Sequence, residues 1–316
     1  MHHKGTTPRT ALALLVLAIG ASQAPAQADP VARGEYLVRA GGCYSCHSAP
    51  GGEPLAGGRA LATPFGIFYS PNITPDRETG IGRWSDADFV RALRKGVRPD
   101  GTNYFPVFPY PSFTGISVED AAAIKAYLFS LPPVHAPDKP HDVSFPFSWR
   151  FLQSGWKLLF FRKGPFHPDP RAGEAVNRGA YLVTALGHCG ECHTPRNAVG
   201  AMRPSRWLAG NPDGPDDETA PNITPDRKTG IGDWSERDLL ALLATGRKPD
   251  ETSVTGSMKE VVADDTRFLT DQDRKAIVSY LKAQKPIENE IRSGEDDDRP
   301  WYQRLWDWLV AFFSFT

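Results

Sequence analysis

The residues with the clearest chemical potential are four cysteines, arranged in two pairs. Each pair has the spacing C-x-x-C and is followed directly by a histidine, in the segments C-Y-S-C-H and C-G-E-C-H. This spacing is typical of covalent haem attachment, in which two thiols form thioethers with one porphyrin and the histidine ligates the iron. The sequence therefore predicts two covalently bound haem c groups. Haem 1 is expected on Cys43, Cys46 and His47, and haem 2 on Cys189, Cys192 and His193.

The same residue types serve two other kinds of site. A redox-active C-x-x-C pair is expected in a βαβ setting, and no such pattern surrounds either pair. Clusters of cysteine and histidine also bind zinc. A zinc site, however, would leave the N-terminal leader and a methionine downstream of the second motif without a role. We therefore favour haem over both alternatives.

Residues 1–28 have the order of an export signal. Lys4 and Arg9 supply the positive start, and an apolar run follows over residues 11–21. An A-x-A cleavage sequence ends at Ala28. The apolar run is shorter than the roughly 20 residues that a membrane-spanning helix needs. We therefore expect cleavage after Ala28 and a mature protein in the periplasm.

The composition fits water-soluble globular domains. The chain has 316 residues, which is enough for two domains, and 40% of them are hydrophobic while 23% are charged. The formal net charge is −1. A chain this close to neutral gives no reason to expect nucleic-acid binding.

The chain contains an internal duplication. The lead-in R-G-x-Y-L-V starts at Arg33 and again at Arg178, ahead of the two cysteine motifs. A longer block, P-N-I-T-P-D-R-x-T-G-I-G-x-W-S, starts at Pro71 and again at Pro221, an offset of 150 residues. Self-similarity of this kind indicates two copies of one structural unit.

Both copies predict the same order of helices. A short helix should precede each haem motif, at about 30–41 and 175–186. A second helix should follow each W-S pair, with a serine N-cap, an aspartate three residues later and a glycine at its end. A third helix should start at an S/T-x-x-D sequence. These signals are Ser85, Asp88, Gly96, Ser117 and Asp120 in the first copy, and Ser235, Asp238, Gly246, Thr270 and Asp273 in the second.

The repeat divides the chain into five parts. The segment between the two copies is rich in proline, phenylalanine and tryptophan. A flexible linker would not be this apolar, so we expect the segment to be ordered and to pack across the domain interface. The parts are a signal peptide at 1–28, a first domain at 29–134, the interdomain segment at 135–172, a second domain at 173–285, and an acidic linker with an aromatic C-terminal helix at 286–316.

The order helix, haem motif, loop, helix, ligand loop, helix resembles the class I cytochrome c fold. The R-G-x-Y-L-V and P-N-I-T blocks, with the loop P-V-F-P-Y, resemble the multihaem cytochrome c subunits of membrane-bound bacterial alcohol and aldehyde dehydrogenases and of related molybdenum hydroxylases. The likeness covers most of residues 33–285, although the typical dehydrogenase subunit has three C-x-x-C-H motifs. It implies an all-α fold of two tandem class I cytochrome c domains, with the first and last helices of each crossing beside the haem.

Such a domain normally supplies a methionine sulfur on the distal side of the iron, which raises the haem potential. Of the three methionines, Met1 leaves with the signal, and Met202 follows His193 too closely to reach the opposite face of the haem. Met258 lies just ahead of the last expected helix. Its position and the resemblance predict Met258 as the distal ligand of haem 2.

The first domain has no equivalent methionine. The 150-residue offset places Phe108 in the position of Met258, and phenylalanine cannot coordinate iron. Three outcomes stay open for haem 1: an iron without a distal ligand, a histidine ligand, or a tyrosine ligand. The candidate side chains are His135, His141, His167, Tyr104 and Tyr110.

The repeated P-N-I-T block allows two interpretations. In the setting of the family, its asparagine and threonine side chains could hydrogen-bond haem propionates. Alternatively they only shape a turn, since asparagine and threonine favour turns. The residues concerned are Asn72, Thr74, Asn222 and Thr224.

The last 16 residues, from Trp301, combine tryptophan, phenylalanine and leucine with a polar face. As a helix they would reach about 24 Å, less than the roughly 30 Å hydrocarbon core of a bilayer. Peripheral contact with the outer face of the cytoplasmic membrane, docking on a partner subunit, and packing on the chain's own domains are the three alternatives.

These observations together predict a dihaem electron carrier. It would take single electrons from a periplasmic or membrane-associated dehydrogenase and pass them to a cytochrome or terminal oxidase. The alternative is a haem enzyme, either peroxidase-like or oxidising a small substrate, or a gas-binding sensor, that uses the methionine-free haem 1. No acid–base pair beside haem 1 is evident in the sequence, so we favour the carrier and assign no catalytic residue.

Overall fold

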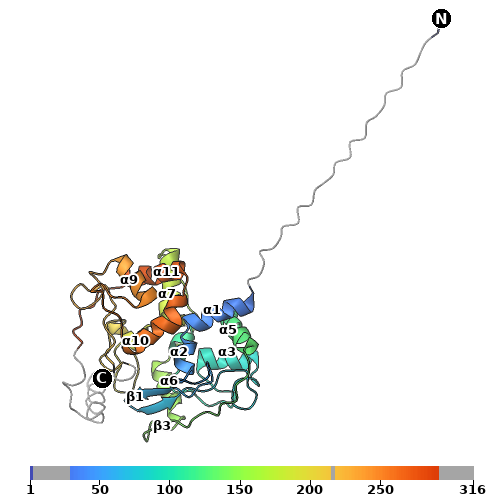
Figure 1. Ribbon diagram of the computed structural model, residues 1–316, viewed down its shortest axis with the longest axis vertical. Coiled ribbons are helices and arrows are strands. Elements are labelled where there is room, and N and C mark those ends of the chain that lie inside the picture. The colour runs from blue at the N-terminus through green and yellow to red at the C-terminus, as the bar shows by residue number, and fades with distance from the viewer. Residues whose placement is uncertain (3–28, 215–217, 292–316) are drawn as a thin grey trace.

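The computed structural model describes residues 1–2, 29–214 and 218–291 (Figure 1). Nearly all of the expected signal peptide and the whole aromatic segment from Trp301 lie outside the described residues. Of the helices within them, none combines the length and the apolar character that a bilayer span requires.

The first half is a small helical unit closed by its first and last helices. Its helices are α1 (Pro30–Ala40), α2 (Cys43–His47), α3 (Asp86–Lys95), α4 (Tyr110–Phe113) and α5 (Val118–Ser130). Helix α1 packs closely on α5 at Gly34, where an added Cβ would lie 2.0 Å from the carbonyl oxygen of Ala123. The glycine of the R-G-x-Y lead-in is therefore required by the helix crossing.

The second half repeats this arrangement. Its helical elements are α7 (Glu174–Tyr181), the π-helical turn η1 (Leu182–Leu186), α8 (Gly190–His193), η2 (Pro204–Arg206), α9 (Glu236–Thr245), α10 (Gly256–Glu260), the π-helical turn η4 (Val261–Asp265), η5 (Thr266–Phe268) and α11 (Asp271–Lys282). Helix α7 crosses α11 at Gly179, where a Cβ would lie 1.9 Å from the carbonyl oxygen of Ala276. The two crossings thus share one close contact.

The helix boundaries follow the capping signals of the sequence. Ser85 and Ser235 each form a reciprocal capping box with the aspartate three residues later. Gly96 and Gly246 end α3 and α9 in the left-handed region, with φ of 57° and 77°. The side chains of Ser117 and Thr270 likewise accept the N3 backbone N–H at the starts of α5 and α11. These predicted starts and stops are confirmed.

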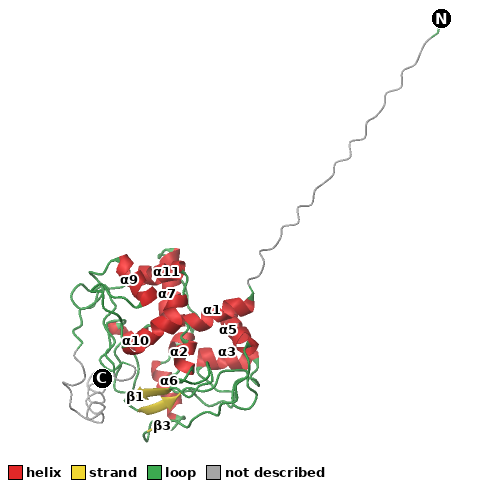
Figure 2. Ribbon diagram, in the orientation of Figure 1, coloured by secondary structure: helices red, strands yellow, loops and turns green. Residues whose placement is uncertain are grey.

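The expectation of an all-α fold is wrong, because two strands of the first half and one strand of the interdomain segment form a three-stranded antiparallel sheet. The strands are β1 (Ala60–Thr63), β2 (Gly66–Tyr69) and β3 (Asp142–Val143), in the order β1-β2-β3. Figure 2 shows the strands at the end of the molecule away from α9 and α11. The β1–β2 pair joins through a tight turn that ends at Gly66 (φ 129°), and β3 approaches this glycine so closely that a Cβ would lie 2.3 Å from Asp142 O. The β1–β2 hairpin is local, but its strands have only four residues each, and the sequence analysis did not predict it. Only β3 is distant in sequence.

The interdomain segment contacts both halves. Besides β3 it forms α6 (Leu152–Phe160), from which Lys157 donates to the carbonyl oxygen of Gly96 at 2.7 Å. On the other side, Trp156 donates its ring N–H to Val199 O at 2.9 Å. The segment also leaves large apolar side chains in solvent, with Leu158 82% exposed and Phe145 68% exposed.

The two halves are joined directly by a reciprocal pair of hydrogen bonds. Tyr36 of the first lead-in donates to Asp273 at the start of α11, at 2.5 Å. Tyr181 of the second lead-in donates to Asp120 at the start of α5, also at 2.5 Å. Each aspartate also accepts from the arginine of its own half. The repeated R-G-x-Y sequence therefore serves both the helix crossing and the contact between the halves.

Candidate haem-binding sites

The first cysteine motif lies on a single helical turn directly after α1. Gly42 leads into α2 in the left-handed conformation (φ 66°), which turns the chain sharply between the two helices. The ring nitrogen Nδ1 of His47 lies 2.8 Å from the carbonyl oxygen of Pro71. A carbonyl can only accept, so Nδ1 carries the proton and Nε2 keeps its lone pair for a metal. This is the tautomer that an iron-ligating histidine needs.

The second motif has the same geometry. His193 Nδ1 lies 2.8 Å from the carbonyl oxygen of Pro221, in the second copy of the P-N-I-T block. His188 occupies the left-handed position that Gly42 holds in the first motif, with φ of 38°. Gly190 lies against the ring of Trp207, which a Cβ would approach to 2.1 Å. Sequence reasoning did not identify the contact with Trp207, because the tryptophan lies far along the chain.

The four cysteines are partly buried and form no disulfide. Burial raises the pKa of the Cys189 thiol to about 11 and that of Cys192 to about 12. Burial likewise raises the pKa of Cys43. These surroundings favour a neutral sulfur, as in a thioether, over the thiolate that zinc requires. Within the described part of the chain, no three histidine, cysteine or acidic side chains converge as a metal cluster.

The side chains of the P-N-I-T block are used within the protein. Asn72 Oδ1 accepts from the backbone N–H and the hydroxyl of Thr74, and Asn72 Nδ2 donates to Val134 O at 2.8 Å. Asn222 makes the same contacts with Thr224 and with Ile287 O. All four side chains are buried. The contacts support the turn-shaping interpretation, and each turn presents a proline carbonyl to the histidine of its C-x-x-C-H motif.

We use the term distal loops for the loops that follow α3 and α9, where a distal ligand is expected. The two loops begin with the same backbone contact. Tyr104 N–H donates to Gly96 O, and Val254 N–H donates to Gly246 O, 150 residues later, each at 2.9 Å. Beyond this point the loops differ. Phe108 precedes α4 and its ring contacts those of Tyr104 and Phe113 at 5.2 and 5.8 Å. Met258 instead lies within α10.

The other candidate ligands of haem 1 lie in varied surroundings. His135 and His167 are exposed, and His135 lies 3.7 Å from a carboxylate oxygen of Glu78. His141 accepts the backbone N–H of Tyr69 at 3.2 Å and contacts Phe68. Burial lowers the pKa of His141, and nearby arginines lower it further. Its Nδ1 is thus occupied by the sheet.

The two tyrosine candidates also lie in different surroundings. Tyr110 is fully buried, and its ring packs against those of Trp156 and Phe161. Tyr104 lies beside Phe108, and burial raises the pKa of its phenol to about 12. Tyr104 is therefore held in its neutral form.

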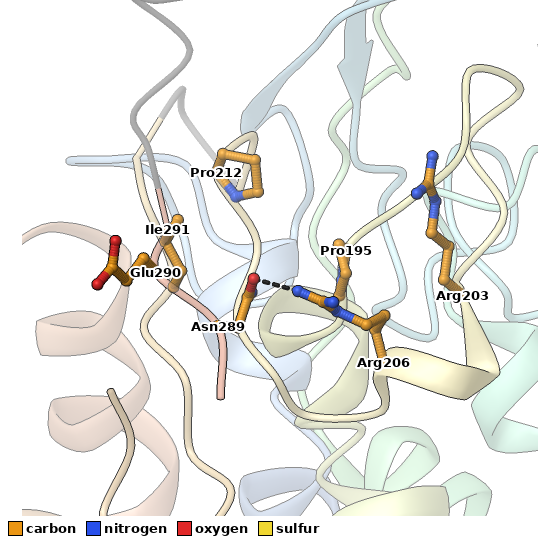
Figure 3. A pocket seen from close by; sticks show the side chains of 7 residues that line it. All are labelled: Pro195, Arg203, Arg206, Pro212, Asn289, Glu290 and Ile291. Atoms are coloured by element: carbon orange, nitrogen blue, oxygen red, sulfur yellow. Dashed lines mark hydrogen bonds between the residues drawn. The ribbon is translucent and has the colours of Figure 1, made fainter. Parts of the chain in front are cut away.

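A surface hollow lies beside the second motif. Figure 3 shows Arg206 hydrogen-bonded to Asn289 across it, with Pro195 at its wall. Asn289 also donates to Ala209 O at 2.7 Å. These contacts tie the segment after α11 to the loop that follows the second haem motif.

The two haem motifs meet where the halves join, a contact that sequence reasoning missed. The second variable residue of each C-x-x-C reaches the other half. Ser45 donates to Asp265 at 3.0 Å, and Glu191 accepts from Ser112 at 2.6 Å. Ser112 and Asp265 occupy equivalent places, 153 residues apart, as do the caps Ser117 and Thr270. We call the two hydrogen-bonded pairs, Ser45 with Asp265 and Ser112 with Glu191, the motif junction.

Comparison with known proteins decides the family. A protein of Cereibacter sphaeroides described as "Diheme cytochrome c-type" is 44% identical, over 88% of this chain and 98% of the relative. This chain belongs to the dihaem c-type cytochromes. The family described as cytochrome c matches residues 31–132 of this cytochrome.

Two further relatives confirm the resemblance drawn from the sequence. The cytochrome c subunit of a quinone alcohol dehydrogenase from Gluconacetobacter polyoxogenes is 40% identical, over 90% of this cytochrome and 62% of the relative. A nicotinate dehydrogenase subunit from Pseudomonas putida is 44% identical, over 79% of this cytochrome but only 21% of the relative. The cytochrome thus spans nearly all of its dihaem relative and a part of the two dehydrogenase subunits.

The cytochrome therefore carries covalent haem c, as the cysteine motifs predicted. The oriented imidazoles and the neutral, partly buried sulfurs fit the group. When bound, haem supplies one-electron chemistry at the iron, while the protein supplies ligands, orientation and burial.

Proposed function

We propose that this cytochrome is the electron-transfer subunit of a periplasmic or membrane-associated dehydrogenase. Relatives that share about 40% of its sequence are named as cytochrome subunits of alcohol, gluconate and fructose dehydrogenases. In this proposal the dehydrogenase delivers electrons one at a time, and a soluble cytochrome or a terminal oxidase removes them.

The proposed ligands follow the repeat. Cys43 and Cys46 hold haem 1, and Cys189 and Cys192 hold haem 2, through thioethers. His47 and His193 ligate the two irons from the proximal side, each oriented by a proline carbonyl at 2.8 Å. Met258 completes haem 2.

The direction of electron flow rests on one observation, the replacement of Met258 by Phe108 in the first half. A methionine ligand raises the haem potential, so haem 1 should have the lower potential of the two. Electrons would then enter at haem 1 and leave from haem 2.

A spectroelectrochemical titration that resolves the two haems tests this order. We expect two one-electron steps, with haem 2 reduced at the higher potential, and loss of that higher step in Met258→Ala. Equal potentials, or loss of the lower step in the variant, would contradict the proposed direction.

The alternative of a haem enzyme or gas sensor depends on the same phenylalanine. Carbon monoxide added to the reduced protein reports whether the iron of haem 1 is open. Turnover of hydrogen peroxide faster than that of free haem would favour the enzyme. An inert protein that still passes electrons from a dehydrogenase to a cytochrome would favour the carrier.

The proposed location is the periplasm, with peripheral contact at the outer face of the cytoplasmic membrane through the aromatic segment from Trp301. Fractionation of cells that express the full chain and a chain ending at Ile291 tests both points. We expect both proteins outside the cytoplasm and only the full chain with the membrane.

A further inference from the structure

The motif junction contains one carboxylate whose charge is poorly compensated. Asp265 is 4% exposed, and its Oδ1 atom is buried without a hydrogen-bond partner among the described residues. Its Oδ2 atom accepts from Ser45, inside the first haem motif. A buried ionised carboxylate is unfavourable unless it is paired or fully hydrogen-bonded. Asp265 therefore lies beside the first haem motif, in a place that disfavours its negative charge.

The equivalent pair on the other side of the junction is compensated. Glu191 accepts from Ser112 through Oε1, and its Oε2 forms an ion pair with Arg196 at 2.6 Å. The two pairs have the same composition, a hydroxyl and a carboxylate. Among the described residues, only Glu191 of the two carboxylates forms an ion pair. The asymmetry singles out Asp265.

The contacts of Ser45 suit both protonation states of Asp265. The Ser45 hydroxyl lies 3.0 Å from Asp265 Oδ2 and 3.0 Å from the carbonyl oxygen of Gly42. When Asp265 is ionised, Ser45 can donate to the carboxylate. When Asp265 is protonated, it can donate to Ser45 Oγ while Ser45 donates to Gly42 O. A proton can thus bind or leave without breaking the junction.

The charges around Asp265 are of both signs. The titratable groups that face it are Arg39 on α1, Cys43 on α2, His188 ahead of α8, Glu260 on α10 and Asp264 on the same turn. The Arg39 guanidinium stacks on the Tyr44 ring at 3.9 Å, and Glu260 pairs with Arg59 at 2.6 Å. Burial raises the pKa of Asp265 to about 8, the hydrogen bond from Ser45 and Arg39 lower it, and Asp264 and Glu260 raise it.

We propose that Asp265 takes up a proton when haem 1 is reduced and releases it when haem 1 is oxidised. With haem 1 bound at the first motif, one electron taken from the donor would add one negative charge in the neighbourhood of the Asp265 carboxylate. One proton from water then converts the carboxylate to the acid, so the charge of the junction is unchanged. The return step releases one electron and one proton.

The measurable consequence is a potential that depends on pH. In the range where Asp265 is ionised beside oxidised haem 1 and protonated beside reduced haem 1, the potential falls as pH rises. One proton per electron corresponds to about 59 mV for each tenfold change in proton concentration. Since burial places its pKa at about 8, this range should lie around neutral to mildly alkaline pH.

Redox titrations of the full haem-loaded protein at several pH values test the proposal. In the wild type we expect the potential of haem 1 to fall as the pH rises. In Asp265→Asn we expect it to be independent of pH over the same pH range. Ser45→Ala should keep the slope but move the pH range in which it occurs to higher pH. The reason is that the hydrogen bond donated by Ser45 lowers the pKa of Asp265, and the variant lacks it. A merely structural role of Asp265 would not produce this pattern.

Two matched variants serve as controls. Glu191→Gln changes the compensated carboxylate and should leave the slope and its pH range unchanged. Asp264→Asn removes a neighbouring charge that raises the pKa of Asp265, so it should keep the slope and move it to lower pH. If Asp265→Asn does not load haem, proton uptake on reduction of the wild type and of Ser45→Ala can be followed with an indicator dye. A wild type without slope or proton uptake, or an Asp265→Asn variant with an unchanged slope, would overturn the proposal.

Discussion

The two distal loops begin with the same backbone contacts but carry different side chains at the equivalent position, Phe108 in the first and Met258 in the second. In both, the loop returns to the glycine that ends the preceding helix, with N–H to carbonyl distances of 2.9 Å. The first loop then places Phe108 among aromatic rings, whereas the second places Met258 on α10. The comparison teaches that a duplicated scaffold can keep the geometry of its haem motifs while the residue at one equivalent position differs between the halves.

The largest effect should follow from removing the attachment sites of one half. Cys43→Ser with Cys46→Ser, and separately Cys189→Ser with Cys192→Ser, should each leave one covalent haem, because thioethers need the sulfurs. Mass spectrometry and the haem absorbance of the denatured proteins measure this. A double variant that keeps both covalent haems would contradict the assigned attachment sites. A variant that loses both would show that the halves do not load haem independently.

The next effect concerns the ligand difference itself. Met258→Ala should lower the potential of haem 2 by on the order of 100 mV, within the range of about 0.8 V that axial ligands span. Its spectrum should then resemble that of haem 1. Met202→Ala provides the matched control and should leave both potentials in place.

The reverse exchange should have a smaller effect. Phe108→Met puts the missing sulfur into the first loop and should raise the potential of haem 1 by less than Met258→Ala lowers that of haem 2. The reason is that Phe108 precedes α4 while Met258 lies inside α10, so the sulfur is not placed equally well. A full conversion of haem 1 would show that the side chain alone decides the difference.

The smallest effect should come from the symmetric contacts. Tyr36→Phe and Tyr181→Phe each remove one hydrogen bond to a carboxylate between the halves, worth about 1.5–3 kcal/mol. Chemical unfolding should show similar losses for the two variants, since the contacts are reciprocal. A loss confined to one variant would show that the interface is less symmetric than its geometry.

Much of the local structure followed from the sequence. The capping boxes at Ser85 and Ser235 and the terminal glycines Gly96 and Gly246 mark helix ends through contacts within a few residues, and such signals are readable in a single chain. The cysteine motifs identified the cofactor because thioether attachment demands a fixed spacing. The proximal and distal ligands are still predictions.

Contacts between residues far apart in the sequence could not be predicted from local sequence patterns. The all-α expectation missed a local hairpin of two four-residue strands, β1 and β2. It also missed β3, which pairs with β2 across more than 70 residues and which no local pattern marks. The pairing of Ser45 with Asp265 spans 220 residues, and no local pattern marks it.

By itself, the sequence determined the duplication, the two haem motifs and the absence of a methionine at position 108, because each depends only on residue identity and spacing. The tertiary structure decided how the two motifs face each other, and it left Asp265 buried beside the first while giving Glu191 a cation. Burial and charge compensation depend on which distant side chains come together, and only the packed chain specifies that.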